Sequence, residues 1–144
     1  MPIKNYTTKV PADRSIQEIQ ASLVKHGAVG MIYKYEKGTG KIEALQFGLE
    51  IKGRTVGFSL PVNWKLFQEV LKKDRVKRWD DEEYVYRVSW RCIRDWVLAQ
   101  LALYETQIVE LPQVFLPFAT GRNGITIYDQ VKEGNLLLGE VTPK

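Results

Sequence analysis

The chain has 144 residues, of which 44% are hydrophobic and 26% charged, the ordinary composition of one globular domain over residues 1–144. Its single cysteine and single histidine exclude an intrachain disulfide and a zinc site built from cysteines and histidines. The net charge of +4 is uneven, because residues 1–78 carry 15 Lys and Arg against 7 Asp and Glu, whereas residues 79–144 carry 6 against 10. This asymmetry predicts an anionic partner for the first half, although a basic face that only keeps the protein soluble explains it equally well.

The N-terminal third begins with an alternating pattern over Ile3–Val10, which predicts a short strand that Pro11 ends. Ser15 and Glu18 have the spacing of a capping box and predict a helix over 15–26, closed by Gly27. The start of the chain lacks the apolar core of a signal peptide. No later run has the length and apolar character of a membrane-spanning segment. We therefore expect a cytoplasmic protein that is neither exported nor inserted.

The middle of the chain has the alternation of half-buried strands over 28–36, 42–51 and 54–60. Glycine-containing turns separate these three segments, so they predict an antiparallel meander with one buried and one wet face.

Two helices are predicted to follow. The first spans 63–73, is capped by Asn63, and turns Leu66, Phe67, Val70 and Leu71 inward. The second spans 81–105 and begins with the acids of Asp80–Glu83, where the helix dipole favours negative charge. After Pro112 the pattern weakens: Val114–Phe118 is apolar, Gly121–Gly124 has turn chemistry, and 125–131 suits a short strand or a helix.

These elements predict an α+β fold, in which a three- to four-stranded antiparallel meander packs against about three helices. The side chains that the patterns turn inward are Ile19, Leu23, Leu45, Phe47, Leu49, Phe58, Leu60, Val88, Cys92, Trp96, Ala99 and Leu103.

No catalytic apparatus is recognisable in the sequence. His26 lies at a predicted helix end, where histidine commonly contacts the last carbonyls, and no feature brings a nucleophile to it. The acids of Asp80–Glu83 lack the spacing of a calcium loop. We therefore predict a protein that is not an enzyme and uses no metal or cofactor.

Three arginines form the most suggestive polar stripe, because Arg87, Arg91 and Arg94 share one side of the predicted helix with Trp90 beside them. Such a stripe could clamp phosphates or stack on a base. Ion pairs of Arg87 with Glu83 and of Arg91 with Asp95 would instead make it a solvated helix face, and both interpretations stay open.

The run from Lys72 to Trp79 is the most basic stretch of the chain and ends in an aromatic residue, as in many single-strand-binding surfaces. A charged connector between two helices would have the same composition. Together with the stripe, it defines a candidate site for nucleic acid or a nucleotide: Lys72, Lys73, Arg75, Lys77, Arg78, Trp79, Arg87, Trp90, Arg91 and Arg94. We expect Trp79 or Trp90 to be partly exposed.

Three stretches carry a resemblance: Lys4–Thr8 leading into the 15–18 helix start and Gly27-Ala28, the pattern from Trp90 to Leu103, and Val114–Phe118. Together they resemble a group of small uncharacterised proteins of phages, prophages and mobile elements. The resemblance implies a protein of the bacterial cytoplasm, an accessory to phage DNA metabolism or an antagonist of host defence, and it implies no activity.

Two functions are therefore expected. The first is non-enzymatic binding of nucleic acid or a nucleotide, and the second is a protein-interaction module that inhibits a host defence complex through an acidic face of that complex. The surplus of aromatic residues also predicts a homo-oligomer with Val114–Phe118 as its interface, unless this segment folds back over its own sheet.

Overall fold

The computed structural model describes residues 2–121, 123–134, 136, 138 and 139. The elements follow one another along the chain as α1 (Ala12–Lys25), β1 (Val29–Tyr35), β2 (Ile42–Ile51), β3 (Arg54–Pro61), α2 (Trp64–Lys73), α3 (Glu82–Glu105), α4 (Leu111–Phe115), the 3-10 turn η1 (Leu116–Phe118) and α5 (Ile127–Lys132).

The sheet is an antiparallel meander of three strands in the order β1-β2-β3. Lys52 and Gly53 both have positive φ, which matches the tight turn that joins β2 to β3. The three strand predictions are therefore confirmed to within a residue at each end, and so is the α+β class.

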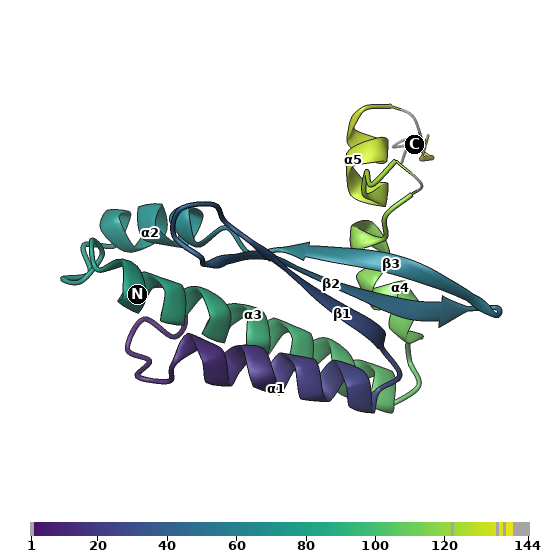
Figure 1. Cartoon of the computed structure of the whole chain (residues 1–144), viewed down its shortest axis with the longest axis horizontal. Coiled ribbons are helices and arrows are strands. Elements are labelled where there is room, and N and C mark those ends of the chain that lie inside the picture. Colours follow the sequence, from purple (N-terminus) through teal and green to yellow (C-terminus); the bar gives the residue numbers. More distant parts are fainter. Residues whose placement is uncertain (1, 122, 135, 137, 140–144) are drawn as a thin grey trace, which may run out of the picture.

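One face of the sheet is covered and the other is largely open. Figure 1 shows α1 and α3 side by side along one face, while α5 stands on the opposite side, beyond β3. Leu45, Phe47 and Leu49 of β2 point to the covered face and are almost fully buried, whereas Gln46 and Glu50 alternate with them.

An aromatic cluster packs α4 and η1 against the covered face of the sheet. The ring of Phe47 stacks on Phe58 at 5.6 Å and meets the edge of Phe115 at 5.4 Å, and Trp96 of α3 contacts Phe115 and Phe118. Phe115 is fully buried, so α4 and η1 fold back over their own sheet. The segment thus covers its own sheet through Phe115, while Leu116 remains 47% exposed. Its use as an intermolecular interface stays a prediction.

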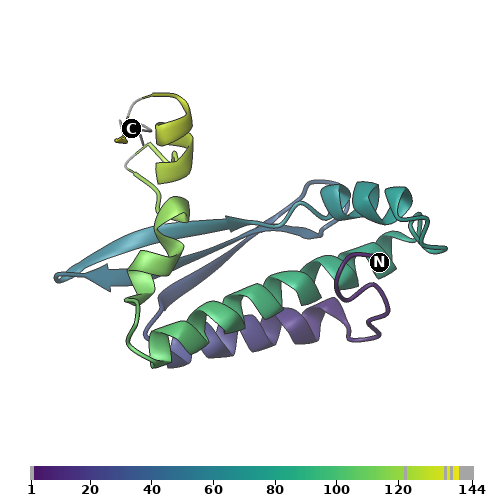
Figure 2. The ribbon, with the colours of Figure 1, turned by 180° about the vertical axis from the view of Figure 1, so that it is seen from behind.

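The segment 3–10 is not a strand, and that prediction is wrong. It forms turns beside the first turns of α3 (Figure 2), where the amide N–H of Ile3 donates to the Asp74 carboxylate and the Asn5 carboxamide donates to Asp95. These hydrogen bonds connect the segment to the C-cap of α2 and to the middle of α3, and they override its weak alternation.

The capping-box prediction is also wrong, because α1 begins three residues earlier. Pro11 occupies the N-cap, and Ser15 lies inside the helix with its hydroxyl buried and unpartnered. The Glu18 carboxylate turns toward α3. Two other expectations are confirmed, since Asn63 caps α2 and Nδ1 of His26 lies 2.7 Å from the carbonyl oxygen of Ser22.

The inward faces of the long helices were predicted only in part. Cys92 and Trp96 are half-buried, and Ala99 and Leu103 are exposed, because α3 packs on α2 at its start and on α1 and α4 further along. No single stripe can face neighbours that change along 24 residues. The other predicted core positions are buried: Ile19, Leu23, Leu45, Phe47, Leu49, Phe58, Leu60 and Val88.

Helix α2 differs from expectation on its outer side. Phe67 and Leu71 point inward, but Leu66 is 62% exposed and Val70 is 39% exposed. Near the end of the chain, Gly121–Gly124 forms the expected turn, with Arg122 outside the described residues, and the ambiguous segment that follows becomes the helix α5.

Candidate functional site

The connection between α2 and α3 gathers most of the predicted site. We call Lys72, Lys73, Arg75, Lys77, Arg78 and Trp79 the basic corner. The last turn of α2 closes when the amide of Val76 donates to the carbonyl of Leu71, which places Arg75 in the left-handed region at φ 59°. All five cations of the basic corner are exposed at this end of the molecule.

Trp79 is half-buried and keeps one cation beside its ring. The ammonium of Lys72 lies 4.9 Å from the ring centroid, and the carboxamide of Gln68 donates to the backbone carbonyl of Trp79. The expectation that Trp79 or Trp90 is partly exposed is met by Trp79. A base would have to displace Lys72 in order to stack on this ring.

Arg87 joins the basic corner through Tyr84. The guanidinium carbons of Arg78 and Arg87 lie 5.0 and 5.8 Å from the ring centroid of Tyr84. Arg78 also donates to Asp81, the N-cap of α3, and this hydrogen bond lowers the pKa of the Asp81 carboxyl. Burial raises the pKa of the Tyr84 phenol, so the ring is a neutral platform for both arginines.

Arg91 and Arg94 do not belong to the same surface. Their guanidiniums donate to one carboxylate oxygen of Glu18 at 2.9 and 2.8 Å, and Arg94 also pairs with Asp95. Partial burial raises the pKa of Glu18, but the two arginines outweigh it and hold this pKa below its usual value. The two residues therefore connect α3 to α1, and a phosphate would have to compete with Glu18 for them. Their role in phosphate binding stays a prediction.

Trp90 is fully buried and packs edge-on against Tyr86 at 6.3 Å. Its ring is therefore not accessible to a base in this structure, and stacking falls to Trp79. The pattern placed Trp90 beside the arginines, but it could not show that the helix turns this side toward α1 and the sheet.

Carboxylates border the basic corner. Between residues 72 and 83 the chain carries five cations, all before residue 79, and five acids, of which four form the run Asp80–Glu83. Glu82 of this run pairs with Lys41 at 3.7 Å. Because the formal charges cancel over residues 72–83, attraction to an anion acts at contact range rather than at a distance.

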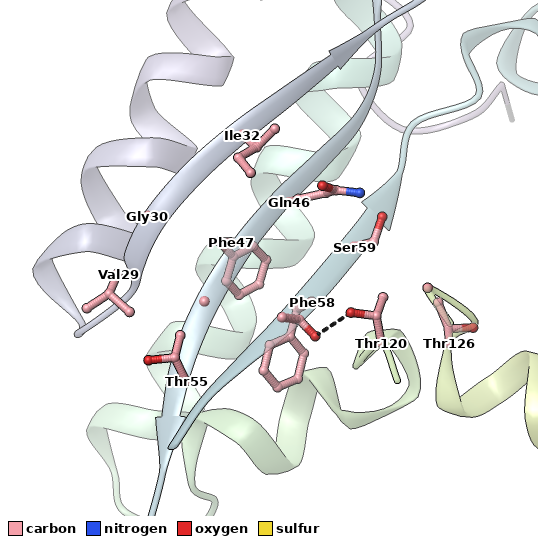
Figure 3. A pocket seen from close by; sticks show the side chains of 13 residues that line it. Val29, Gly30, Ile32, Gln46, Phe47, Thr55, Phe58, Ser59, Thr120 and Thr126 are labelled. Atoms are coloured by element: carbon pink, nitrogen blue, oxygen red, sulfur yellow. Dashed lines mark hydrogen bonds between the residues drawn. The ribbon is translucent and has the colours of Figure 1, made fainter. Parts of the chain in front are cut away.

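The open face of the sheet contains a groove that the sequence patterns did not indicate. Figure 3 shows it between the side chains of β1 and β2 and the threonines Thr120 and Thr126, which border it along β3. Its volume is about 480 Å³. We call it the outer groove, and its lining is Val29, Gly30, Ile32, Gln46, Phe47, Gly48, Thr55, Gly57, Phe58, Ser59, Thr120, Gly124 and Thr126.

Thr120 positions the wall of this groove. Its amide and its hydroxyl both donate to the carbonyl of Gly57, at 2.8 and 3.1 Å, while Ala119 forms a bridge with Phe58. The wet face was predicted from the alternation of Gln46, Gly48 and Glu50. The wall could not be predicted, because it comes from a segment some sixty residues later along the chain.

In the described part of the chain, no group of three or more His, Cys, Asp or Glu side chains is placed to hold a metal ion. Among the same residues, no helix has the length and the apolar run needed to cross a bilayer. No protein-family model, curated protein or solved structure matches this chain.

Proposed function

We propose that this chain is a non-enzymatic binding protein that takes an anionic partner, nucleic acid or a nucleotide, on the basic corner extended by Arg87. One observation carries the proposal. Lys72, Lys73, Arg75 and Lys77 are exposed on a single connection, and none forms an ion pair with a described carboxylate. Exposed cations without a carboxylate partner are free to pair with phosphates and so release counterions from them.

A second candidate function is supported by α2. Leu66 and Val70 are exposed one turn apart, and the helix continues into Lys72 and Lys73. Exposed aliphatic side chains next to lysines suit an acidic protein surface with its own apolar residues better than they suit phosphates. The protein-interaction module, including an inhibitor of a host defence complex, rests on this pair of side chains.

Salt-dependent binding to a labelled single-stranded oligonucleotide pool, measured by fluorescence anisotropy, tests the first function. We expect the logarithm of affinity to fall linearly with the logarithm of salt concentration, by about 0.7 per neutralised phosphate. Binding that is absent even at low salt would remove polymeric nucleic acid as the partner.

A charge-reversal variant locates the contact. Lys73→Glu with Lys77→Glu should weaken binding at least roughly tenfold and reduce the salt slope, because two phosphate contacts become repulsive. The matched control is Lys25→Glu with Lys52→Glu, which changes the net charge equally but at the end of α1 and in the β2–β3 turn. Equal losses in both variants would contradict a defined site.

Leu66→Ser with Val70→Ser separates the two functions. The exchange removes apolar surface that phosphates do not use, so oligonucleotide affinity should stay within about twofold of the original. An acidic protein partner that needs these side chains would lose affinity in this variant.

A further inference from the structure

The outer groove differs from an ordinary solvated sheet face in its lack of charge. None of its thirteen lining residues is charged, although 26% of the whole chain is. Charged side chains normally keep an open sheet face hydrated and discourage aggregation. A charged ligand would also find no counterion among these residues. The chemistry of the lining therefore favours a neutral ligand.

Glycines keep the groove hollow. Gly57 is exposed, and a Cβ atom there would meet only the Thr120 hydroxyl, at 3.1 Å. At position 48 a side chain is excluded by sterics, since a Cβ atom there would lie 2.7 Å from the carbonyl oxygen of Val29. Together they leave part of the pleated backbone without side chains, a surface on which a flat group can lie closely.

Two polar side chains offer a free hydrogen-bonding edge. Gln46 and Ser59 are cross-strand partners, they lie on the same side of the groove in Figure 3, and neither side chain bonds to another described group. Of the other hydroxyls in the lining, that of Thr120 donates to Gly57 and that of Thr126 accepts from the amide of Asp129. The hydroxyl of Thr55, at the start of β3, also bonds to no other described group. A carboxamide places a donor and an acceptor side by side.

Apolar contact is available next to Gln46, on β1. Ile32, the partner of Gln46 on β1, is 62% exposed, and Val29 is 41% exposed. A planar ring lying between Ile32 and the Thr120 wall would bury these aliphatic side chains while its edge reaches Gln46 and Ser59.

From this combination we infer that the outer groove binds a neutral planar heterocycle with a donor and an acceptor along one edge, which is the chemistry of a nucleobase. Gln46 pairs with that edge, Ser59 adds one hydrogen bond, and Ile32 packs against the ring. The sugar points toward solvent, and no phosphate contact is needed. The site is separate from the basic corner and does not depend on the function proposed for it.

A two-dimensional NMR titration of the full chain with adenosine, guanosine, cytidine and uridine tests the inference. We expect at least one nucleoside to shift the side-chain amide of Gln46 and the backbone amides of Gly57, Ser59 and Thr120. The matching nucleoside monophosphate should bind within about threefold of the nucleoside, because no described residue of the lining is a cation. A lack of shifts at millimolar nucleoside, or a monophosphate that binds tenfold tighter and shifts the basic corner, would overturn it.

Gln46→Leu keeps a similar volume on the open face and removes the hydrogen-bonding edge, so nucleoside affinity should fall at least tenfold. Gln17→Leu, at an exposed position of α1, is the matched control and should bind as the original does. Ser59→Ala, a smaller change, should lose less affinity than Gln46→Leu. If nucleosides bind Gln46→Leu and Gln17→Leu equally well, Gln46 is not the recognition group and the inference fails.

Discussion

Glu18 is the residue whose role changed most between sequence and structure. It was assigned to a helix cap, and it instead accepts from Arg91 and Arg94, so that one carboxylate withdraws two arginines from the candidate site. A helical wheel shows which residues share a side, but the partner across the helix interface lies 73 or 76 positions away in sequence. This is why the sequence pattern could not show that both arginines already have a carboxylate partner.

Glu18→Gln should lower the free energy of unfolding by about 1–2 kcal/mol at pH 7, since it removes a partly buried carboxylate that pairs with Arg91, Arg94 and the more exposed Arg14. The folded-state pKa of Glu18 is lowered, so its contribution is present above the unfolded-state pKa and is lost as pH falls through the folded-state pKa. The difference between variant and original should therefore shrink in acid. Urea unfolding at pH 7 and near pH 3 measures this.

Glu50→Gln is the control for that experiment, because Glu50 is exposed and forms no ion pair with a described residue. Its unfolding free energy should differ from the original by less than about 0.5 kcal/mol. An equal loss in both variants would contradict a specific role for Glu18.

At the scale of the elements, prediction succeeded where the determinants are local. The strands follow from strict alternation and glycine turns, and Asn63 caps α2 through its own side chain. It failed at Ile3–Val10 and at the faces of α3, where tertiary neighbours decide. The same distinction separates the basic corner, which is one continuous stretch, from the outer groove, whose wall is remote in sequence.

Arg75 ends α2 in a conformation that favours glycine, at φ 59°. Arg75→Gly should raise the free energy of unfolding by about 0.5–1 kcal/mol, because glycine adopts this conformation without steric strain. The same variant should bind the oligonucleotide pool more weakly, since a cation of the basic corner is lost. Chemical denaturation and anisotropy together reveal these opposite changes.

Arg75→Ala is the matched variant, since alanine keeps the strain and removes the charge. It should lose affinity as Arg75→Gly does, without any gain in stability. If Arg75→Gly gains stability and keeps full affinity for the oligonucleotide pool, Arg75 ends α2 but does not contact the ligand.

At the scale of the whole molecule, Val114–Phe118, the segment predicted as an oligomer interface, packs against its own sheet through Phe115. The outer edge of β1 remains unpaired among the described residues. The free edge of β1 presents Val29, Ile32 and Tyr35, which are 41%, 62% and 58% exposed. Irregularities in register after Val29 and after Lys34 limit the regular part of this strand to a few residues. Short, interrupted edges pair weakly, as their main-chain hydrogen bonds are few.

The homo-oligomer therefore stays a prediction with a new interface, a weak dimer formed by antiparallel pairing of β1 with its copy. Sedimentation at increasing protein concentration should show association only at tens of micromolar and above, because a few hydrogen bonds and three exposed side chains bury little area. Tyr35→Lys should weaken this association, because a lysine on an edge strand discourages pairing with another strand. Leu116 is 47% exposed and lies on η1, away from β1. Leu116→Lys should therefore leave the association unchanged. A monomer at all concentrations, or a dimer that Leu116→Lys disrupts, would contradict pairing through β1.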